Sequence, residues 1–280
     1  MMTLPVFYAD EIIDRALKED INYIDVATDL TIDSDETSHA VMLAKADGVL
    51  CGLDIAMRVF SHIGTSVTFK TYKKDGDRIK KGEIIAELDG LTRELLKGER
   101  TALNIIQHMS GIATATARCI ELVKGTRATV ADTRKTLPGL RAIEKYAVMT
   151  GGGKNHRFNL SDAAMLKDNH IDAAGSITAA VKKLREHLGH TVKIEVETRN
   201  LNEVKEALDS RADIIMLDNM STDEMKKAVE VINGRALSEA SGGITEQNIA
   251  EIAACGVDII SLGALTHSAK ALDISLKIKK

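Results

Sequence analysis

The spacing of hydrophobic and polar residues changes near residue 110 and divides the chain into two parts. In the first part, apolar residues such as Ile12, Ile13 and Leu17 recur at helical spacing and predict an amphipathic helix around 9–18. Short extended runs follow, with Asp-Gly and Lys-Gly pairs as turns between them. These runs are 41–45, 66–72 and 83–90. The first part is therefore expected to combine helices with a sheet.

A long helix then leads into a regular alternation of strands and helices. The helix is predicted over 91–124, with Gly98 and Gly111 as possible breaks. From residue 128 onward, β-branched runs alternate with helical patterns, which is typical of parallel β/α units with right-handed crossovers. The predicted strands are 128–133, 164–166, 192–197, 213–217, 235–241 and 258–263. The helices between the later strands are 176–188, 200–207, 222–232 and 246–254.

The number of these β/α units indicates the architecture of the second part. Six units are too few for a closed eight-unit barrel, which takes about 250 residues. We therefore predict an α/β protein whose second domain, over 111–268, is an open, incomplete α/β barrel. A C-terminal helix over 269–280 is expected to pack back on a first domain that covers 1–110.

One predicted strand carries charge on the face that should look into the barrel. Along 192–197 the even positions are Val or Ile, which suit the outer helices, and the odd positions are Lys193, Glu195 and Glu197. Charged groups inside a barrel are costly unless they bind something. This strand is thus a candidate part of a binding site.

Composition narrows the class of protein. The chain has 280 residues with 37 Lys and Arg against 41 Asp and Glu, so a net charge of −4 gives no reason to expect nucleic acid or an anionic membrane as a partner. Aromatic residues make up 3%, too few for base-stacking platforms. The three cysteines form no CxxC pair, no apolar run reaches the length of a membrane span, and the N-terminus becomes acidic too early for a signal peptide. We expect a reduced, cytoplasmic protein.

Cationic side chains gather where the predicted strands end. These are Arg134, Lys135, His156, Arg157 and Lys167. The C-terminal ends of barrel strands are where barrel active sites are built. Guanidinium groups bind carboxylates and phosphates in a bidentate manner, so this set predicts an anionic ligand.

Acidic residues and glycines occupy the remaining strand ends. Glu195, Glu197 and Asp218 suit Mg²⁺, ribose hydroxyls or a developing positive charge. Two short runs resemble the backbone cradles that bind phosphate after late barrel strands. They are Ser241, Gly242 and Gly243, and Leu262, Gly263 and Ala264. Together these features predict a polyanionic ligand with a phosphate and further carboxylates.

Each feature also has an ordinary structural explanation when it is taken singly. The triple glycine 151–153 is typical of a helix stop, and a lone Lys167 usually faces solvent. His170 and His267 are more often hydrogen-bonded structural residues than ligands. For Glu195 and Glu197 the ordinary explanation is a salt bridge with Lys193 inside the barrel. Suitable groups at six consecutive strand ends nevertheless favour a functional site.

At these residues the sequence resembles a known family. The block DTRKTLPGLRAIEKYAVMTGGGKNHRFNLSDAAMLKDNH, from Asp132 to His170, is similar to the signature of quinolinate phosphoribosyltransferases. Further matches follow the family's order at 98–114, 195–198, 217–219, 239–244 and 256–268. The resemblance implies an N-terminal α/β sandwich domain with an open α/β barrel, as in type II phosphoribosyltransferases. It also implies phosphoribosyl transfer from 5-phosphoribosyl 1-diphosphate to quinolinate, with Mg²⁺ and decarboxylation, in de novo NAD synthesis.

The resemblance implies a role for each matching residue. Lys135 would contact the diphosphate, and Glu197 with Asp218 would bind the ribose and Mg²⁺. Arg100 would reach into the partner's site of a homodimer. The quinolinate carboxylates would be held by Arg134, His156, Arg157 and Lys167. The remaining substrate-binding residues would be Thr133 and the phosphate cradle Ser241, Gly242, Gly243, Leu262, Gly263 and Ala264.

Several points stay open at the level of sequence. Glu195 and Glu197 both point inward, so either is a candidate for the ribose, and Arg141 and Lys145 could contact substrate or line the rim. A phosphoribosyltransferase for nicotinate would need fewer cations at the base end. A Schiff-base aldolase using Lys167 would leave the acids and glycines unexplained. A carrier protein built on the hairpin 67–90 is the third alternative.

Overall fold

Two units, each with its own sheet, make up the chain. The computed structural model describes residues 4–279. Unit 1 extends to Ala117 and includes Thr136–Gly152 and the residues from Leu265 onward. Unit 2 consists of Arg118–Lys135 and Gly153–Ala264. The return of the C-terminal segment to the first unit was expected, but the boundary at residue 110 was not reproduced, because unit 1 extends to Ala117 and also includes Thr136–Gly152.

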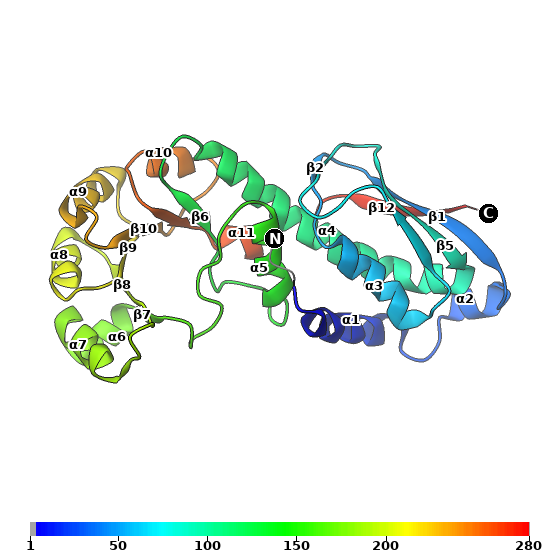
Figure 1. The fold of residues 1–280 in the computed structure, drawn as a ribbon, viewed down its shortest axis with the longest axis horizontal. Helices are drawn as coiled ribbons and strands as arrows, with labels where there is room; N and C mark the ends of the chain where they lie inside the picture. Colours follow the sequence, from blue (N-terminus) through cyan, green and yellow to red (C-terminus); the bar gives the residue numbers. More distant parts are fainter. Residues whose placement is uncertain (1–3, 280) are drawn as a thin grey trace. The chain divides into compact units, whose positions relative to one another are not determined.

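Unit 1 is built on a four-stranded antiparallel sheet with the order β12-β1-β5-β3. Its strands are β1 (Thr37–Ala44), β3 (Thr68–Thr71), β5 (Ile84–Leu91) and β12 (Ile274–Lys279). A small second sheet pairs β2 (Gly48–Val49) with β4 (Arg78–Ile79). The helices are α1 (Val6–Ile21), α2 (Val26–Thr31), α3 (Leu53–Ile63), α4 (Thr92–Leu122), which continues into unit 2, and α5 (Arg141–Thr150). Helices α3 and α4 lie along one face of the larger sheet (Figure 1).

The C-terminal helix expected over 269–280 is wrong. Ile274–Lys279 forms strand β12, which pairs antiparallel with β1. Buried Ile274 and Leu276 alternate with the more exposed Ser275 and Lys277, which is the period-two pattern of a strand with one buried face. The partner strand lies more than two hundred residues earlier in the sequence, so the strand depends on a contact that no local pattern reveals.

Helix α4 runs for 31 residues without the breaks expected at its glycines. A Cβ on Gly98 would lie 2.5 Å from Cδ1 of Phe60, and one on Gly111 would lie 2.3 Å from the carbonyl oxygen of Lys270. These glycines therefore permit close packing against the helix.

We predict that Gly111→Ala lowers the stability of the chain although alanine is the better helix former. The clash is with a backbone oxygen, so it should cost about 1–3 kcal/mol and outweigh the helix preference of roughly 1 kcal/mol. Gly189→Ala is the matched control because a Cβ there meets nothing within 4 Å. Urea unfolding of both variants tests this, and a Gly111→Ala protein as stable as the wild type would contradict it.

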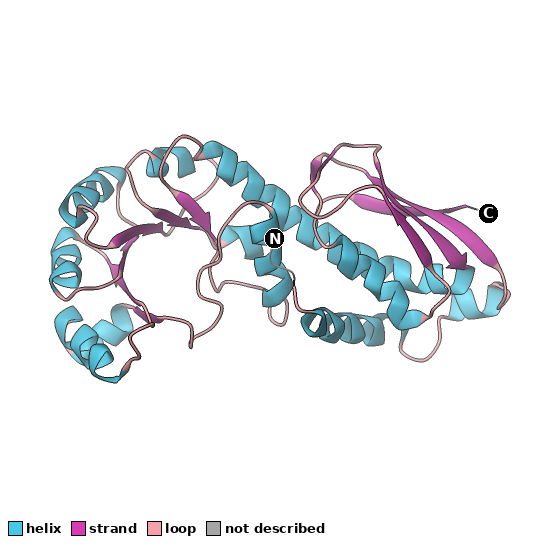
Figure 2. Ribbon diagram, in the orientation of Figure 1, coloured by secondary structure: helices cyan, strands magenta, loops and turns pink. Residues whose placement is uncertain are grey.

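Unit 2 is a six-stranded parallel sheet with the order β6-β11-β10-β9-β8-β7. Its strands are β6 (Thr129–Ala131), β7 (Ala164–Leu166), β8 (Ile194–Thr198), β9 (Ile214–Asp218), β10 (Leu237–Ser241) and β11 (Ile259–Ser261). Its helices are α6 (Asp168–Ala174), α7 (Ile177–His187), α8 (Leu201–Asp209), α9 (Thr222–Ile232) and α10 (Ile249–Ala253), and α11 (Ala264–His267) begins at its last residue. The sheet curves with helices on its outer side and β6 and β7 as its two edges (Figure 2). The prediction of an open, incomplete barrel is confirmed.

A short segment after α5 lies beside the β6 edge. Lys154 forms a parallel bridge with Ala131, and its backbone N–H donates to the carbonyl of Val130 at 2.9 Å. The N–H of Asp132 in turn donates to the carbonyl of Lys154 at 3.2 Å. This pairing fixes the backbone just before His156. Within the described residues, no helix is both long and apolar enough to cross a membrane.

Candidate active site

The strand ends of unit 2 carry most of the predicted site residues, whereas His156 and Arg157 lie in the loop before β7 and Arg100 lies on α4. Because the six strands are parallel, their C-terminal ends lie along the same edge of the curved sheet. Thr133, Arg134 and Lys135 follow β6, and Lys167 follows β7. Glu197 lies near the end of β8, and Asp218 ends β9. The remaining residues close β10 and β11 or follow them: Ser241, Gly242, Gly243, Leu262, Gly263 and Ala264.

Two arginines on this edge are half-buried and close enough to repel each other. The guanidinium of Arg157 donates to the carbonyl of Ala163 at 3.0 Å and to Sδ of Met165 at 3.5 Å. Burial lowers the pKa of Arg157, and the charge of Arg134 lowers it further. Like charges held together in a partly buried place favour the binding of an anion with more than one carboxylate.

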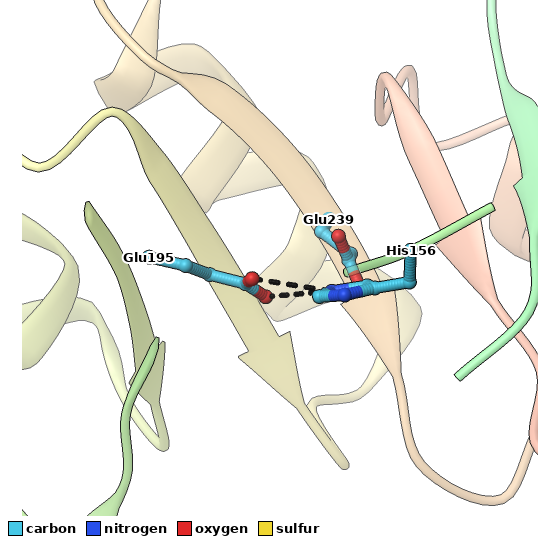
Figure 3. Close-up of side chains that lie close together, drawn as sticks. All are labelled: His156, Glu195 and Glu239. Carbon is cyan, nitrogen blue, oxygen red and sulfur yellow. Dashed lines mark hydrogen bonds and ion pairs between the residues drawn. The ribbon is translucent and has the colours of Figure 1, made fainter. Parts of the chain in front are cut away.

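A histidine and two carboxylates form a buried cluster inside the barrel, as Figure 3 shows. Nε2 of His156 lies 3.1 Å from Oε2 of Glu195 and 3.5 Å from Oε1 of Glu239. Both glutamate side chains are 1% exposed. Burial lowers the pKa of His156, whereas its hydrogen bonds to the two carboxylates raise it. Burial also raises the pKa of Glu195.

The hydrogen bonds of His156 show how its ring is oriented. Nδ1 accepts the backbone N–H of Arg157 at 2.8 Å, so the ring proton that faces the two carboxylates is on Nε2. A metal ion bound to Nε2 would require the ring proton on Nδ1, where it would meet the backbone N–H of Arg157. The three residues therefore fit a hydrogen-bonded charge cluster rather than a metal site. Glu239 was not among the predicted site residues, although a glutamate within a short strand was a signal for it.

The structure separates the roles of the two glutamates on β8. Glu195 faces the buried cluster, whereas Glu197 lies nearer the strand end and forms an ion pair with Lys167. The Glu197 side chain is 15% exposed and that of Lys167 is 45% exposed. Glu197 is therefore the one of the two that reaches the rim. The suggested pairing of these glutamates with Lys193 is wrong, because Lys193 lies 3.6 Å from Asp213 instead.

Asp218 lies on the strand next to Glu197. Its carboxylate accepts the side-chain amide of Asn219 at 2.8 Å, and the N–H of Asn219 donates to the carbonyl of Ser241 at 2.9 Å. Carboxylate oxygens on neighbouring strand ends are ligands that suit Mg²⁺. Glu197 and Asp218 therefore have the chemistry that a magnesium site requires.

The loop after β10 has the backbone form of a phosphate cradle. Gly242 and Gly243 have φ values of +92° and +60°, and a Cβ on Gly242 would lie 2.3 Å from Oδ1 of Asn219. Within the described residues neither glycine N–H donates a hydrogen bond. Leu262 was expected to belong to the phosphate cradle. Its N–H instead donates to the carbonyl of Ala131 at 2.9 Å and is not available to a phosphate.

Comparison with known proteins identifies the family. The chain matches the profile "Quinolinate phosphoribosyl transferase, N-terminal domain" over residues 25–110. It matches "Quinolinate phosphoribosyl transferase, C-terminal domain" over residues 112–277. The chain belongs to the quinolinate phosphoribosyltransferase family.

Curated relatives and solved structures of this family agree over nearly the full length. The chain is 44% identical to a probable nicotinate-nucleotide pyrophosphorylase (carboxylating) of Bacillus subtilis, covering 96% of this chain and 92% of the relative. It is 42% identical to the corresponding protein of Methanocaldococcus jannaschii, with 97% of each covered. NadC from Streptococcus pyogenes superposes with a TM-score of 0.96 at 44% identity, covering 100% of this chain and 99% of that one.

The family membership resolves the three alternatives. Human nicotinic acid phosphoribosyltransferase is 12% identical with a TM-score of 0.58, which shows a shared fold alone. The amine of Lys167 pairs with Glu197, so it lacks the desolvated surroundings of a Schiff-base lysine. The hairpin 67–90 supplies β3 and β5 of the unit 1 sheet, as expected for plain sheet. The chain is an enzyme, a phosphoribosyltransferase of the quinolinate family.

Five further residues named in the sequence analysis remain to be placed, three basic residues of unit 1 and two histidines. Arg100 is exposed on α4, whereas Lys145 is buried in α5 and so does not line an exposed rim. Nε of Arg141 donates to Oγ1 of Thr136 at 2.9 Å. Nδ1 of His170 accepts the N–H of Lys167 at the start of α6, and Nδ1 of His267 bonds to Oγ of Ser268. Both histidines thus have the structural contacts expected of them.

Proposed function

We propose that the chain transfers the phosphoribosyl group of 5-phosphoribosyl 1-diphosphate to the ring nitrogen of quinolinate. The 2-carboxylate then leaves as CO₂, and the products are nicotinate mononucleotide, CO₂ and diphosphate, as in de novo NAD synthesis. The curated relatives carry the names of this activity. The observation that carries the proposal is the half-buried pair Arg134 and Arg157, because a dicarboxylate needs fixed cations that a monocarboxylate does not.

At the base end, Arg134, Arg157 and Lys167 hold the two carboxylates of quinolinate. The contacts of Arg157 with Ala163 and Met165 hold its guanidinium in place before substrate binds, which limits the entropy lost on binding. His156 differs from the role implied by the resemblance, because its ring faces Glu195 and Glu239. His156 supports the base end indirectly, because its ring accepts the backbone N–H of Arg157.

At the ribose end, Glu197 and Asp218 bind the ribose hydroxyls and hold Mg²⁺. When bound, Mg²⁺ neutralises diphosphate charge and makes that group a better leaving group. The two carboxylates stabilise the positive charge that develops on the ribose. Lys135 contacts the departing diphosphate, and the N–H groups of Gly242 and Gly243 bind the 5′-phosphate together with Ser241, Gly263 and Ala264.

Loss of CO₂ follows from the chemistry of the ribosylated ring. Once the ring nitrogen carries the ribose it is positive, so it stabilises the ylide that remains when the adjacent carboxylate leaves. The protein needs to position the dicarboxylate and exclude water. We also propose a homodimer with Arg100 in the partner's site, and a cytoplasmic location, which suits three buried free cysteines.

A product assay tests this function. The chain is incubated with quinolinate, 5-phosphoribosyl 1-diphosphate and Mg²⁺, and CO₂ and nicotinate mononucleotide are followed together. Both should appear in equal amounts, and neither without metal. A mononucleotide formed from nicotinate but not from quinolinate would reject the assignment of the base end while leaving that of the phosphate end.

A further inference from the structure

The buried acids of unit 2 have no part in the reaction as described so far. Glu195 and Glu239 come from β8 and β10, and both point at the ring of His156 (Figure 3). Oε1 of Glu239 is buried, and among the described residues it faces Nε2 of His156 at 3.5 Å. Two carboxylates at this depth are costly, and they are retained only where nearby charge compensates them.

The cluster is connected to the arginine pair through the backbone. The N–H of His156 donates to Oδ1 of Asp132 at 2.7 Å, and Asp132 directly precedes the loop that carries Arg134. The N–H of Arg157 donates to Nδ1 of the His156 ring at 2.8 Å. The ring of His156 therefore fixes the backbone on which Arg157 stands, and the backbone of His156 is tied to the start of the loop that bears Arg134.

The cluster is also connected to the arginines by charge. The Glu195 carboxylate favours the charged form of Arg157, which opposes the effects of burial and of Arg134. Without negative charge behind them, two half-buried guanidinium groups would repel each other and move apart. Glu239 adds a second negative charge at the same ring atom, Nε2 of His156.

We propose that Glu239, together with Glu195, is a positioning residue for the base end of the site. The two acids hold His156, and through it they keep Arg134 and Arg157 close enough to bind a dicarboxylate. This inference rests on the proposed function. It predicts that the acids govern quinolinate binding and leave the ribose and phosphate end unchanged, because Glu197 and Asp218 lie outside the cluster.

Two substitutions at one position separate charge from shape. Glu239→Gln keeps the size and removes the charge, whereas Glu239→Asp keeps the charge and shortens the side chain. We expect Glu239→Gln to raise the KM for quinolinate about tenfold, a typical effect of losing an interaction with a charged group, with less than about a twofold change for 5-phosphoribosyl 1-diphosphate. Glu239→Asp should lie closer to the wild type. If Glu239 had a purely structural role, the order would be reversed, and the KM of the isosteric Glu239→Gln variant would lie closer to that of the wild type than the KM of Glu239→Asp.

Controls make each outcome decisive. Asp10→Asn is a matched change, because Asp10 is a carboxylate that pairs with a histidine, His62, at 3.0 Å in unit 1, and it should change neither KM. If Glu239→Gln does not fold, Glu195→Gln should show the same split between the two substrates. An unchanged KM for quinolinate, equal changes for both substrates, or Gln closer to wild type than Asp would overturn the inference. A wild-type chain that forms no product from quinolinate would overturn the proposed function as well.

Discussion

Lys135→Ala should bind quinolinate like the wild type and lose nearly all turnover. Lys135 is exposed, while the neighbouring Arg134 is half-buried. We therefore assign Arg134 to the base end of the site and Lys135 to the diphosphate, although the two residues are adjacent in one loop. The N–H of Lys135 donates to Oγ1 of Thr133 at 3.0 Å, which fixes the turn between them. If Lys135 meets the leaving diphosphate as proposed, removing its charge should lower kcat by about 10³-fold, because that interaction is strongest in the transition state.

Calorimetry and initial rates measure the two parts of this prediction separately. The quinolinate Kd should stay within about threefold of the wild type, since the base end does not use Lys135. Lys135→Arg should recover part of kcat because it keeps the charge, and Lys182→Ala on the outer helix α7 is the control for loss of an exposed lysine. Parallel loss of quinolinate binding and turnover would show that Lys135 belongs to the base end.

The strands of unit 2 were predictable because short extended runs, most of them rich in apolar residues, alternate regularly with helical patterns. Residues 164–166 form β7 as expected, and the acids of 192–197 face the barrel interior. Charged residues at strand ends then indicated the site edge, because parallel strands bring those ends together.

Features that depend on distant partners were not predictable in the same way. The His156 cluster joins residues from three segments, and only the curvature of the sheet brings them within reach. Glycine within a helix pattern was interpreted as a break at Gly111, but its cause is the approach of Lys270 from the C-terminal segment. Hydrogen bonding of the Leu262 N–H depends on the register of β11 against β6.

Arg100 is the one predicted site residue that belongs to unit 1. It is exposed on α4 in unit 1, and it has no ion-pair partner among the described residues. Burial raises the pKa of the adjacent Glu99, and the charge of Arg100 opposes this effect. An exposed arginine is suited to an anion on another copy of the chain, which is the role that the resemblance implies.

Mixing two inactive variants should therefore restore activity. Arg100→Ala and Lys135→Ala should each be nearly inactive alone. In a hybrid dimer, the subunit with intact Lys135 receives an intact Arg100 from its partner, so one of the two sites is complete. Random exchange makes half of the dimers hybrid, so the mixture should reach about a quarter of wild-type activity. Subunit exchange is followed with differently tagged chains, and exchange without recovery would place Arg100 in the site of its own chain or outside the site.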